Sequence, residues 1–178
     1  IQVGLAALWR DWGITPDGVV GHSVGEIAAL HVAGVLSLAD AVRVVWNRCH
    51  IMQQATGLGR MASVAVSEED AAALVRAYGD RLSIGAVNGP RSVVLSGEST
   101  ALAEVLNELT ARGVHHKMLP VQYAFHSAQM APFQRRLADA LRDVPFADTR
   151  VAFYSTVTGA DASRARVDAD YVARNVRA

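Results

Sequence analysis

The residues with the clearest chemical potential in this chain form the pentapeptide Gly21-His22-Ser23-Val24-Gly25. Two β-branched residues, Val19 and Val20, precede it, and sequence that favours a helix follows it. This strand–turn–helix layout is typical of a nucleophile elbow, a tight turn that exposes a serine hydroxyl. The start of the following helix favours developing negative charge near that hydroxyl. Ser23 is therefore the candidate nucleophile, and we expect a Cβ at either flanking glycine to crowd the strand or the helix.

A serine hydroxyl is a weak nucleophile at neutral pH, so Ser23 needs a base within hydrogen-bond reach. Histidine is the usual choice, because its unperturbed pKa is about 6.5. The chain has 6 histidines: His22, His31, His50, His115, His116 and His126. Only His126 lies beside a small-residue turn where a predicted insert returns to the main part of the chain. A structural hydrogen-bonding role fits that position too, and sequence spacing does not choose between the two.

Four segments before residue 60 must position the elbow. A helix over 1–12 and a turn at 15–18 precede the strand, and a helix from Val24 to Val32 follows the serine. The pair Ser37 and Asp40 then predicts a capping box that opens a helix to about residue 55. On that helix the apolar residues could face the core and leave Arg48 pointing elsewhere; they are Val42, Val45, Trp46 and Ile51.

From Met61 onward the pattern changes to short strands that alternate with helices. Over about 60–122 the predicted order is β-α-β-β-α-β, which is the ferredoxin-like arrangement. We interpret this segment as a small subdomain inserted into a larger one. The larger subdomain, 1–59 and 123–178, is predicted to be an incomplete α/β-hydrolase-like fold, with a parallel-sheet core that carries the elbow.

Composition excludes several classes of protein. The chain of 178 residues is 51% hydrophobic and 19% charged with a formal net charge of +0, so nothing indicates a nucleic-acid partner. One cysteine, Cys49, excludes an internal disulfide framework and favours a reducing, cytoplasmic location. No apolar run reaches the ~20 residues that span a bilayer, and no cluster has metal-ligand spacing. Because the chain starts at Ile1 within a helical pattern, we expect a piece of a longer protein.

Several separated motifs resemble the acyltransferase domain of modular type I polyketide synthases, which is related to the malonyl-CoA:acyl-carrier-protein transacylase of fatty-acid synthesis. In chain order these motifs are Gly21-His22-Ser23-Val24-Gly25-Glu26-Ile27-Ala28-Ala29, the run 31–41, Ala86-Val87-Asn88-Gly89-Pro90, Tyr123-Ala124-Phe125-His126-Ser127 and Tyr171-Val172-Ala173-Arg174-Asn175-Val176-Arg177. The resemblance covers essentially the whole chain. Motifs that recur in the right order are far more specific than one pentapeptide.

The resemblance implies a Ser–His dyad. Ser23 would be acylated and His126 would be its base, with the imidazole oriented by a main-chain carbonyl in the region of Asn175. The Val24 N–H would hold the oxyanion together with a donor from a loop that, in the family, lies N-terminal to the matched segment. Arg48 matches the arginine that binds the free carboxylate of an extender unit, a task that suits a planar guanidinium.

The same resemblance implies the substrate-binding residues His22, Asn88, Tyr123 and Phe125. The chain has Arg48-Cys49-His50 where the family has arginine-serine-arginine, so the second arginine is replaced. Malonyl users usually carry His-Ala-Phe-His before the serine and methylmalonyl users Tyr-Ala-Ser-His, so Tyr123-Ala124-Phe125-His126 is a hybrid. Phe125 leaves less room for an α-methyl group than serine would, and Val24 is more typical of malonyl users. We therefore favour malonyl, although one methyl group changes binding by only about 1–3 kcal/mol.

The implied reaction moves an acyl group from CoA to Ser23 and then to the phosphopantetheine thiol of an acyl carrier protein. No bound cofactor or metal is needed, and the expected partners are the carrier protein and flanking ketosynthase and linker domains. One alternative is an α/β-hydrolase such as a thioesterase, which shares Gly-x-Ser-x-Gly but transfers the acyl group to water. The other is an inactive, truncated docking fragment.

Overall fold

The computed structural model describes residues 1–177, which divide into two compact units. Unit 1 comprises Ile1–His50 and Arg135–Asn175, and unit 2 comprises Ile51–Gln134 and the chain from Val176. The segment over about 60–122, which we predicted to be an insert, falls within unit 2. Its boundary with the larger subdomain remains a prediction.

Unit 1 contains a three-stranded sheet of order β1-β6-β7. Strand β1 pairs in parallel with β6, Val19 opposite Phe153, whereas β7 pairs with β6 in the antiparallel direction. Its complete elements are α1 (Gln2–Asp11), β1 (Gly18–Val20), α2 (Gly25–Val32), β6 (Ala152–Ser155), β7 (Ala160–Asp161) and α7 (Ala169–Arg174). The sheet is therefore mixed, and the predicted parallel core consists of the β1–β6 pair. Strand β7 lies in a short polar segment whose sequence is typical of a turn.

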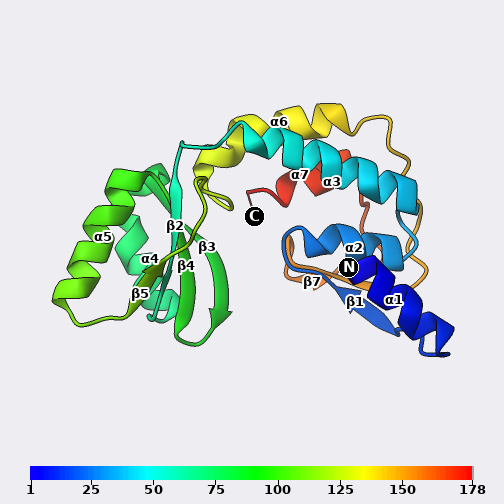
Figure 1. Ribbon diagram of the computed structural model, residues 1–178, viewed down its shortest axis with the longest axis horizontal. Coiled ribbons are helices and arrows are strands. Elements are labelled where there is room, and N and C mark those ends of the chain that lie inside the picture. Colours follow the sequence, from blue (N-terminus) through cyan, green and yellow to red (C-terminus); the bar gives the residue numbers. More distant parts are fainter. Residues whose placement is uncertain (178) are drawn as a thin grey trace. The chain divides into compact units, whose positions relative to one another are not determined.

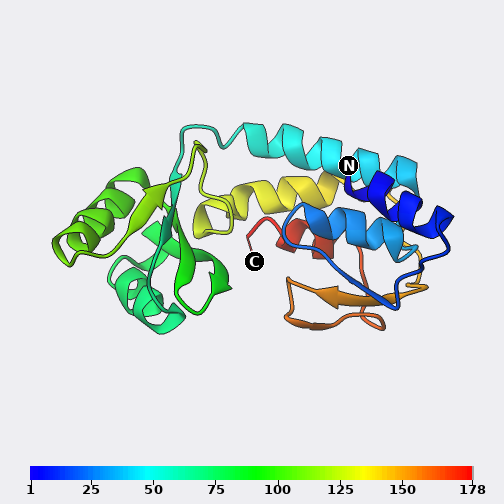
Figure 2. The same cartoon turned by 60° about the horizontal axis from the view of Figure 1, so that its bottom comes forward.

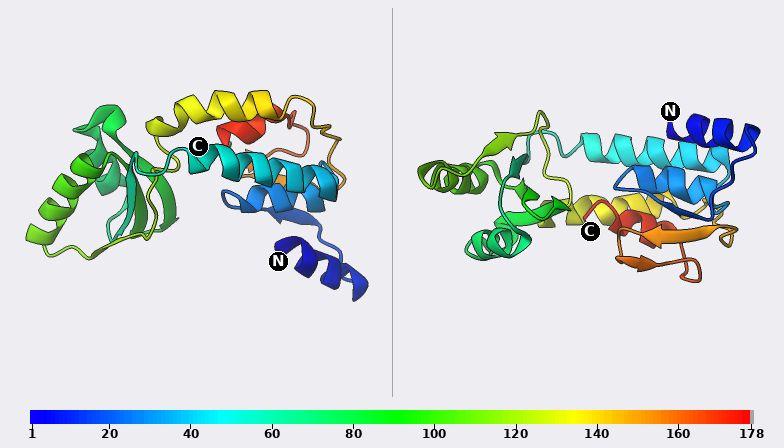
Figure 3. Two further views of the ribbon diagram at one scale, coloured as in Figure 1. Left: turned by 45° about the horizontal axis from the view of Figure 1, so that its top comes forward. Right: turned by 90° about the horizontal axis from the view of Figure 1, so that it is seen from below.

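Helix α2 lies between the three-stranded sheet and α3 (Leu38–Gln53), as Figures 2 and 3 show. It begins directly after the elbow and buries Ile27, Ala29 and Leu30. Small side chains in this helix permit close packing on both of its sides. Helix α7 starts where Asp168 caps it by accepting a hydrogen bond from the Tyr171 N–H at 2.9 Å.

Helix α3 begins at the predicted capping box, in which Ser37 Oγ accepts from the Asp40 N–H at 3.0 Å. The prediction of its buried face was correct for Ile51 but wrong for Val42, Trp46 and Arg48. Val42 and Trp46 are exposed, whereas Arg48 is buried on a face with recurring apolar residues: Ala41, Val44, Ile51, Met52 and Ala55. That spacing is one helical stripe, and Arg48 belongs to it. The end of α3 and the start of α6 (Ala131–Ala140) belong to unit 2.

Unit 2 contains a four-stranded antiparallel sheet of order β3-β4-β2-β5. Figure 1 shows α4 and α5 on the same side of this sheet. In chain order the elements are β2 (Arg60–Val64), α4 (Glu68–Arg76), β3 (Leu82–Gly89), β4 (Ser92–Gly97), α5 (Ser99–Ala111) and β5 (His116–Met118), with short 3₁₀ turns at Gly79–Arg81 and Ala128–Met130. This is the predicted β-α-β-β-α-β order.

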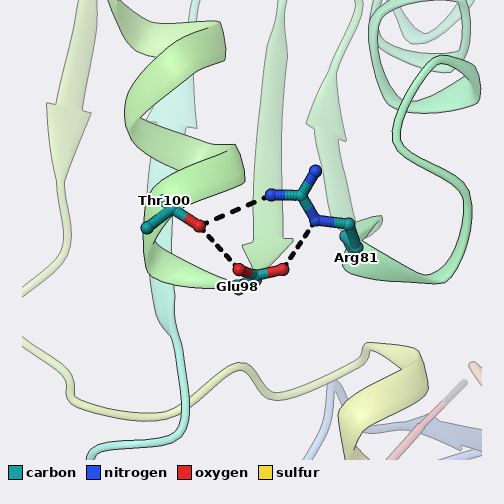
Figure 4. Close-up of polar contacts among 3 residues, drawn as sticks. All are labelled: Arg81, Glu98 and Thr100. Atoms are coloured by element: carbon teal, nitrogen blue, oxygen red, sulfur yellow. Dashed lines mark hydrogen bonds and ion pairs between the residues drawn. The ribbon is translucent and has the colours of Figure 1, made fainter.

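The core of unit 2 consists of apolar side chains, for example Val64, Leu95 and Leu102 from β2, β4 and α5. Ser67 caps α4, because its Oγ accepts from the Asp70 N–H at 3.1 Å. Charged groups lie at the surface. The Arg81 Nε donates to Glu98 at 2.7 Å and Thr100 donates to the other Glu98 oxygen at 2.6 Å (Figure 4).

None of the helices formed by residues 1–177 has the length and apolar character that a membrane crossing requires.

Candidate active site

The turn between β1 and α2 has the geometry of a nucleophile elbow. Ser23 has a φ of 53°, in the left-handed region that non-glycine residues seldom adopt. A Cβ on Gly21 would lie 2.3 Å from the Gly25 carbonyl oxygen and 2.5 Å from the Glu26 nitrogen. Because both are backbone atoms, only glycine fits at position 21. The turn is closed by the Gly25 N–H, which donates to the His22 carbonyl at 2.9 Å.

The second glycine of the motif is less restricted than we expected. A Cβ on Gly25 would meet the end of the Gln2 side chain at 3.2 Å, and that flexible group can move aside. The expected crowding is therefore correct for Gly21 and wrong for Gly25.

Arg48 reaches from α3 to the nucleophile. Its Nη2 donates to the Ser23 Oγ at 3.1 Å and to the Asn175 Oδ1 at 3.5 Å, the long end of the hydrogen-bond range. All three residues belong to unit 1. The register of α3, which places residue 48 on the buried stripe, brings the guanidinium beside the serine.

The environment of Arg48 is that of a binding group rather than a surface cation. The residue is only 6% exposed, and burial lowers the pKa of its guanidinium below the ordinary value, an effect that Cys49 partly opposes. A guanidinium still carries its charge at neutral pH. Within residues 1–177 its buried Nε has no hydrogen-bond partner. A carboxylate accepts from two guanidinium nitrogens at once, so a carboxylated acyl group suits this donor.

Behind Arg48 lies a polar network that sequence analysis missed. Glu26, only 2% exposed, accepts from the Asn175 Nδ2 at 2.8 Å, the Tyr171 hydroxyl at 3.0 Å and the Thr156 N–H at 2.9 Å. The Tyr171 hydroxyl also lies 2.5 Å from the Ser155 Oγ. Burial raises the pKa of Tyr171 above its ordinary value, and the Glu26 charge adds to this while Ser155 opposes it. The one available signal was a single acidic residue in the otherwise apolar start of α2.

His126 lies in unit 2, in a loop that is held by hydrogen bonds to its main-chain atoms. It is buried, has a φ of 57°, and its N–H donates to the Val176 carbonyl at 3.1 Å. The Ser96 Oγ from β4 donates to the Phe125 carbonyl at 2.5 Å, and the Ser127 Oγ donates to the Ala124 carbonyl at 2.6 Å. A positive φ in a buried, non-glycine residue is typical of functional sites.

The other predicted site residues lie in the elbow and in unit 2. His22 is exposed in the elbow, and Val24 is the N-cap residue of α2. The Tyr123 and Phe125 rings stack with centroids 4.4 Å apart, and Asn88 is exposed in β3. Ser23, Arg48 and Asn175 belong to unit 1, and His126, Tyr123, Phe125 and Asn88 to unit 2. The dyad, the oxyanion donor and the orienting main-chain carbonyl of Asn175 remain predictions.

The described part of the chain contains no group of three or more His, Cys, Asp or Glu residues that could hold a metal ion.

Comparison with known proteins identifies the family. Residues 1–178 match the family described as "Acyl transferase domain". Mycoketide-CoA synthase of Mycobacterium tuberculosis is 44% identical over 177 residues, which are 99% of this chain and 4% of that protein. The chain thus spans a small fraction of the curated relative.

Two solved structures are also similar to the chain. The acyltransferase domain from module 8 of the salinomycin polyketide synthase has a TM-score of 0.94 at 39% identity, covering 99% of this chain and 42% of that one. The acyl transferase domain of SpnD in complex with 2-(pent-4-yn-1-yl)malonyl has a TM-score of 0.88 at 30% identity, covering 99% and 42%. The elbow, the buried arginine and these matches agree: the chain belongs to the acyl transferase domain family, among the acyltransferase domains of modular polyketide synthases.

Proposed function

We propose that this chain takes a carboxylated extender unit from its CoA thioester onto Ser23 and passes it to the phosphopantetheine thiol of an acyl carrier protein. The observation that carries the proposal is the Arg48 guanidinium, which is buried and donates to the Ser23 Oγ at 3.1 Å. A cation beside the nucleophile has a purpose when the acyl group itself bears a negative charge.

In the first half-reaction the Ser23 hydroxyl attacks the thioester carbonyl, and His126 accepts the hydroxyl proton. The negative charge on the carbonyl oxygen is stabilised by the Val24 N–H at the start of α2. The carbon–sulfur bond then breaks, and the CoA thiolate takes the proton back from His126. In the second half-reaction the carrier thiol attacks the acyl-serine by the same steps in reverse, which gives ping-pong kinetics.

Among extender units we favour malonyl over methylmalonyl. The Phe125 ring stacks on Tyr123 in the loop that carries His126, and a phenylalanine at this position leaves less room for an α-substituent than a serine would. The relative SpnD was solved with a substituted malonyl group, which supports carboxylated acyl groups as the substrate class in the family. His22 and Asn88 complete the proposed substrate-binding set.

We further propose that the chain works within a polyketide synthase, beside ketosynthase and linker domains and with a carrier protein as acyl acceptor. This rests on relatives such as mycoketide-CoA synthase, of which the matched segment is 4%. Acyl-CoA and the phosphopantetheine arm are substrates, so no bound cofactor is required.

A serine thioesterase is the competing function, because it uses the same elbow. It needs no buried cation beside the serine, whereas Arg48 is held there by α3. An inactive docking fragment would have no reason to keep Ser23 in a left-handed conformation with a φ of 53°.

The test uses the domain with the flanking sequence of its native protein, a panel of acyl-CoAs and intact mass spectrometry. Wild type should gain a malonyl adduct, and Ser23→Ala and His126→Ala should gain none. Arg48→Ala should lose its preference for carboxylated over uncharged acyl groups. Transfer to carrier-protein thiol is followed in the same samples.

Two outcomes would contradict the proposal. Rapid hydrolysis of malonyl thioester without transfer to carrier thiol would favour the thioesterase. An Arg48→Ala variant that still prefers malonyl-CoA over acetyl-CoA would remove Arg48 from carboxylate binding.

A further inference from the structure

Glu26 is a buried carboxylate without a salt bridge. It follows the elbow directly in α2, is 2% exposed, and takes part in none of the ion pairs formed within residues 1–177. A buried charge is costly unless hydrogen bonds replace its lost hydration. Both Glu26 carboxylate oxygens accept hydrogen bonds.

The first oxygen, Oε1, accepts only from groups in the segment after β6 and from α7. The Thr156 N–H lies 2.9 Å away, the Thr156 hydroxyl 3.2 Å and the Tyr171 hydroxyl 3.0 Å. A backbone N–H can only donate. The group that faces Thr156 must therefore be an acceptor.

The second oxygen, Oε2, accepts from the Asn175 Nδ2 at 2.8 Å. An amide that donates on one side presents its carbonyl oxygen on the other, so Glu26 determines which way the Asn175 amide is turned. The Asn175 Oδ1 then faces the Arg48 Nη2 at 3.5 Å, and the same Nη2 donates to the Ser23 Oγ at 3.1 Å. One side chain thus connects the carboxylate to the guanidinium.

We propose that Glu26 is a positioning residue for acyl-group selection. Its carboxylate fixes the Asn175 amide, and that amide holds the Arg48 guanidinium beside Ser23. The inference rests on the proposed role of Arg48 in binding the extender carboxylate. It adds that the selectivity depends on a residue that touches neither the substrate nor the arginine.

The chemistry of the site explains why a carboxylate is needed. Glutamine has the same shape but only one acceptor oxygen, and that oxygen would accept from the Thr156 N–H. The glutamine amide would then point its own N–H groups at Asn175, and the Asn175 amide would turn over to avoid two facing donors. Its Nδ2 would face Arg48, donor against donor, and the guanidinium would lose its support.

The experiment compares acylation by malonyl-CoA and by acetyl-CoA, which lacks the free carboxylate, for wild type, Glu26→Gln, Arg48→Ala and the double variant. We expect Glu26→Gln to lower kcat/KM for malonyl-CoA by about 10- to 100-fold, the range of a lost hydrogen bond to a charged group, with little change for acetyl-CoA. In the Arg48→Ala background, Glu26→Gln should leave the malonyl-to-acetyl ratio unchanged. Glu69→Gln, on the exposed side of α4, is the matched control and should behave as wild type.

A second variant covers the case in which Glu26→Gln fails to fold. Asn175→Ala removes the connecting amide but leaves its main-chain carbonyl and the Thr156 and Tyr171 bonds to Glu26. It should also lower the malonyl-to-acetyl ratio. An unchanged ratio in Asn175→Ala, an equal loss with both acyl-CoAs in a folded Glu26→Gln, or a further change of ratio in the Arg48→Ala background would each overturn the inference. If Arg48→Ala itself left the ratio unchanged, the proposed function would fail instead.

Discussion

Both units bury apolar side chains, but among the described residues the buried carboxylate and guanidinium lie in unit 1. Unit 2 has an apolar core in which residues such as Leu95 and Leu102 are 0% and 1% exposed, and its Arg81–Glu98 pair lies at the surface. Unit 1 buries a carboxylate, a guanidinium and a carboxamide in one connected network: Glu26, Arg48 and Asn175. Burial of apolar area stabilises a fold, whereas burial of charge usually gives little net stability. The difference fits the proposed function, in which unit 1 gives up some stability to position Arg48 for binding the extender carboxylate.

The largest effect on folding should come from the apolar core. Leu102→Ala removes a side chain that is 1% exposed and leaves a cavity between α5 and the sheet. Such truncations cost about 2–5 kcal/mol. Denaturant unfolding of the variant measures this loss. A cost near zero would mean that unit 2 does not owe its stability to this core.

The next effect should come from the network in unit 1. Tyr171→Phe removes the hydroxyl that donates to Glu26, and an incompletely satisfied buried acceptor costs about 1–3 kcal/mol. Because the pKa of Tyr171 is raised in the folded protein, its contribution is present below about pH 10 and is lost as the pH rises further. Wild type should therefore lose more stability than Tyr171→Phe between about pH 8 and pH 11. Equal losses would show that the pKa of Tyr171 is the same in the folded and the unfolded protein.

Replacing Arg48 should change the free energy of unfolding less than the two substitutions above, although it should strongly reduce malonyl transfer. Arg48→Met replaces a buried cation that forms no ion pair among residues 1–177 with an apolar side chain of similar length, which removes the cost of burying that charge and its unbonded Nε. The free energy of unfolding should stay within about 1 kcal/mol of wild type or rise, while malonyl transfer falls. Thermal unfolding and acylation rates are measured on the same sample. A strongly destabilised Arg48→Met would contradict the view that unit 1 gives up stability for binding.

The smallest effect belongs to the surface of unit 2. Glu98→Gln removes an exposed ion pair with Arg81, and exposed pairs contribute little. The hydrogen bond from Arg81 lowers the pKa of Glu98, so any contribution is present above about pH 4.5 and disappears as the pH falls through the folded-state pKa. Unfolding midpoints of wild type and variant should nearly coincide at neutral pH and converge further in acid. A large difference at neutral pH would show that this surface pair matters as much as the buried network.

Local patterns predicted the elements well because caps and turns are local. Ser37, Ser67 and Asp168 begin helices α3, α4 and α7 through side-chain bonds to residues three positions ahead. The ferredoxin-like element order also follows from local alternation. The mixed character of the unit 1 sheet was not predictable, because the two-residue β7 looks like a turn in sequence.

It was harder to predict which residues are buried and which distant residues come into contact. Helix α3 has apolar residues on two faces: Val42 and Trp46 are exposed, whereas Ala41, Val44 and Ile51 are buried. Because both faces carry apolar residues, the sequence pattern did not show on which of them Arg48 lies. The Glu26 network joins residues 130 to 149 positions apart, for which a single sequence carries no pairing signal.

The loop that carries His126 is anchored through its main chain. Ser96, Ser127 and Val176 hold this loop through main-chain atoms of Phe125, Ala124 and His126. None of these hydrogen bonds uses the side chain of Tyr123 or Phe125. The two rings can therefore be exchanged for others without altering the path of the chain. Under their proposed role in substrate binding, new substrate preferences would then arise by point substitution on a constant scaffold. A fold that anchors the backbone and leaves the side chains interchangeable is well suited to diversification.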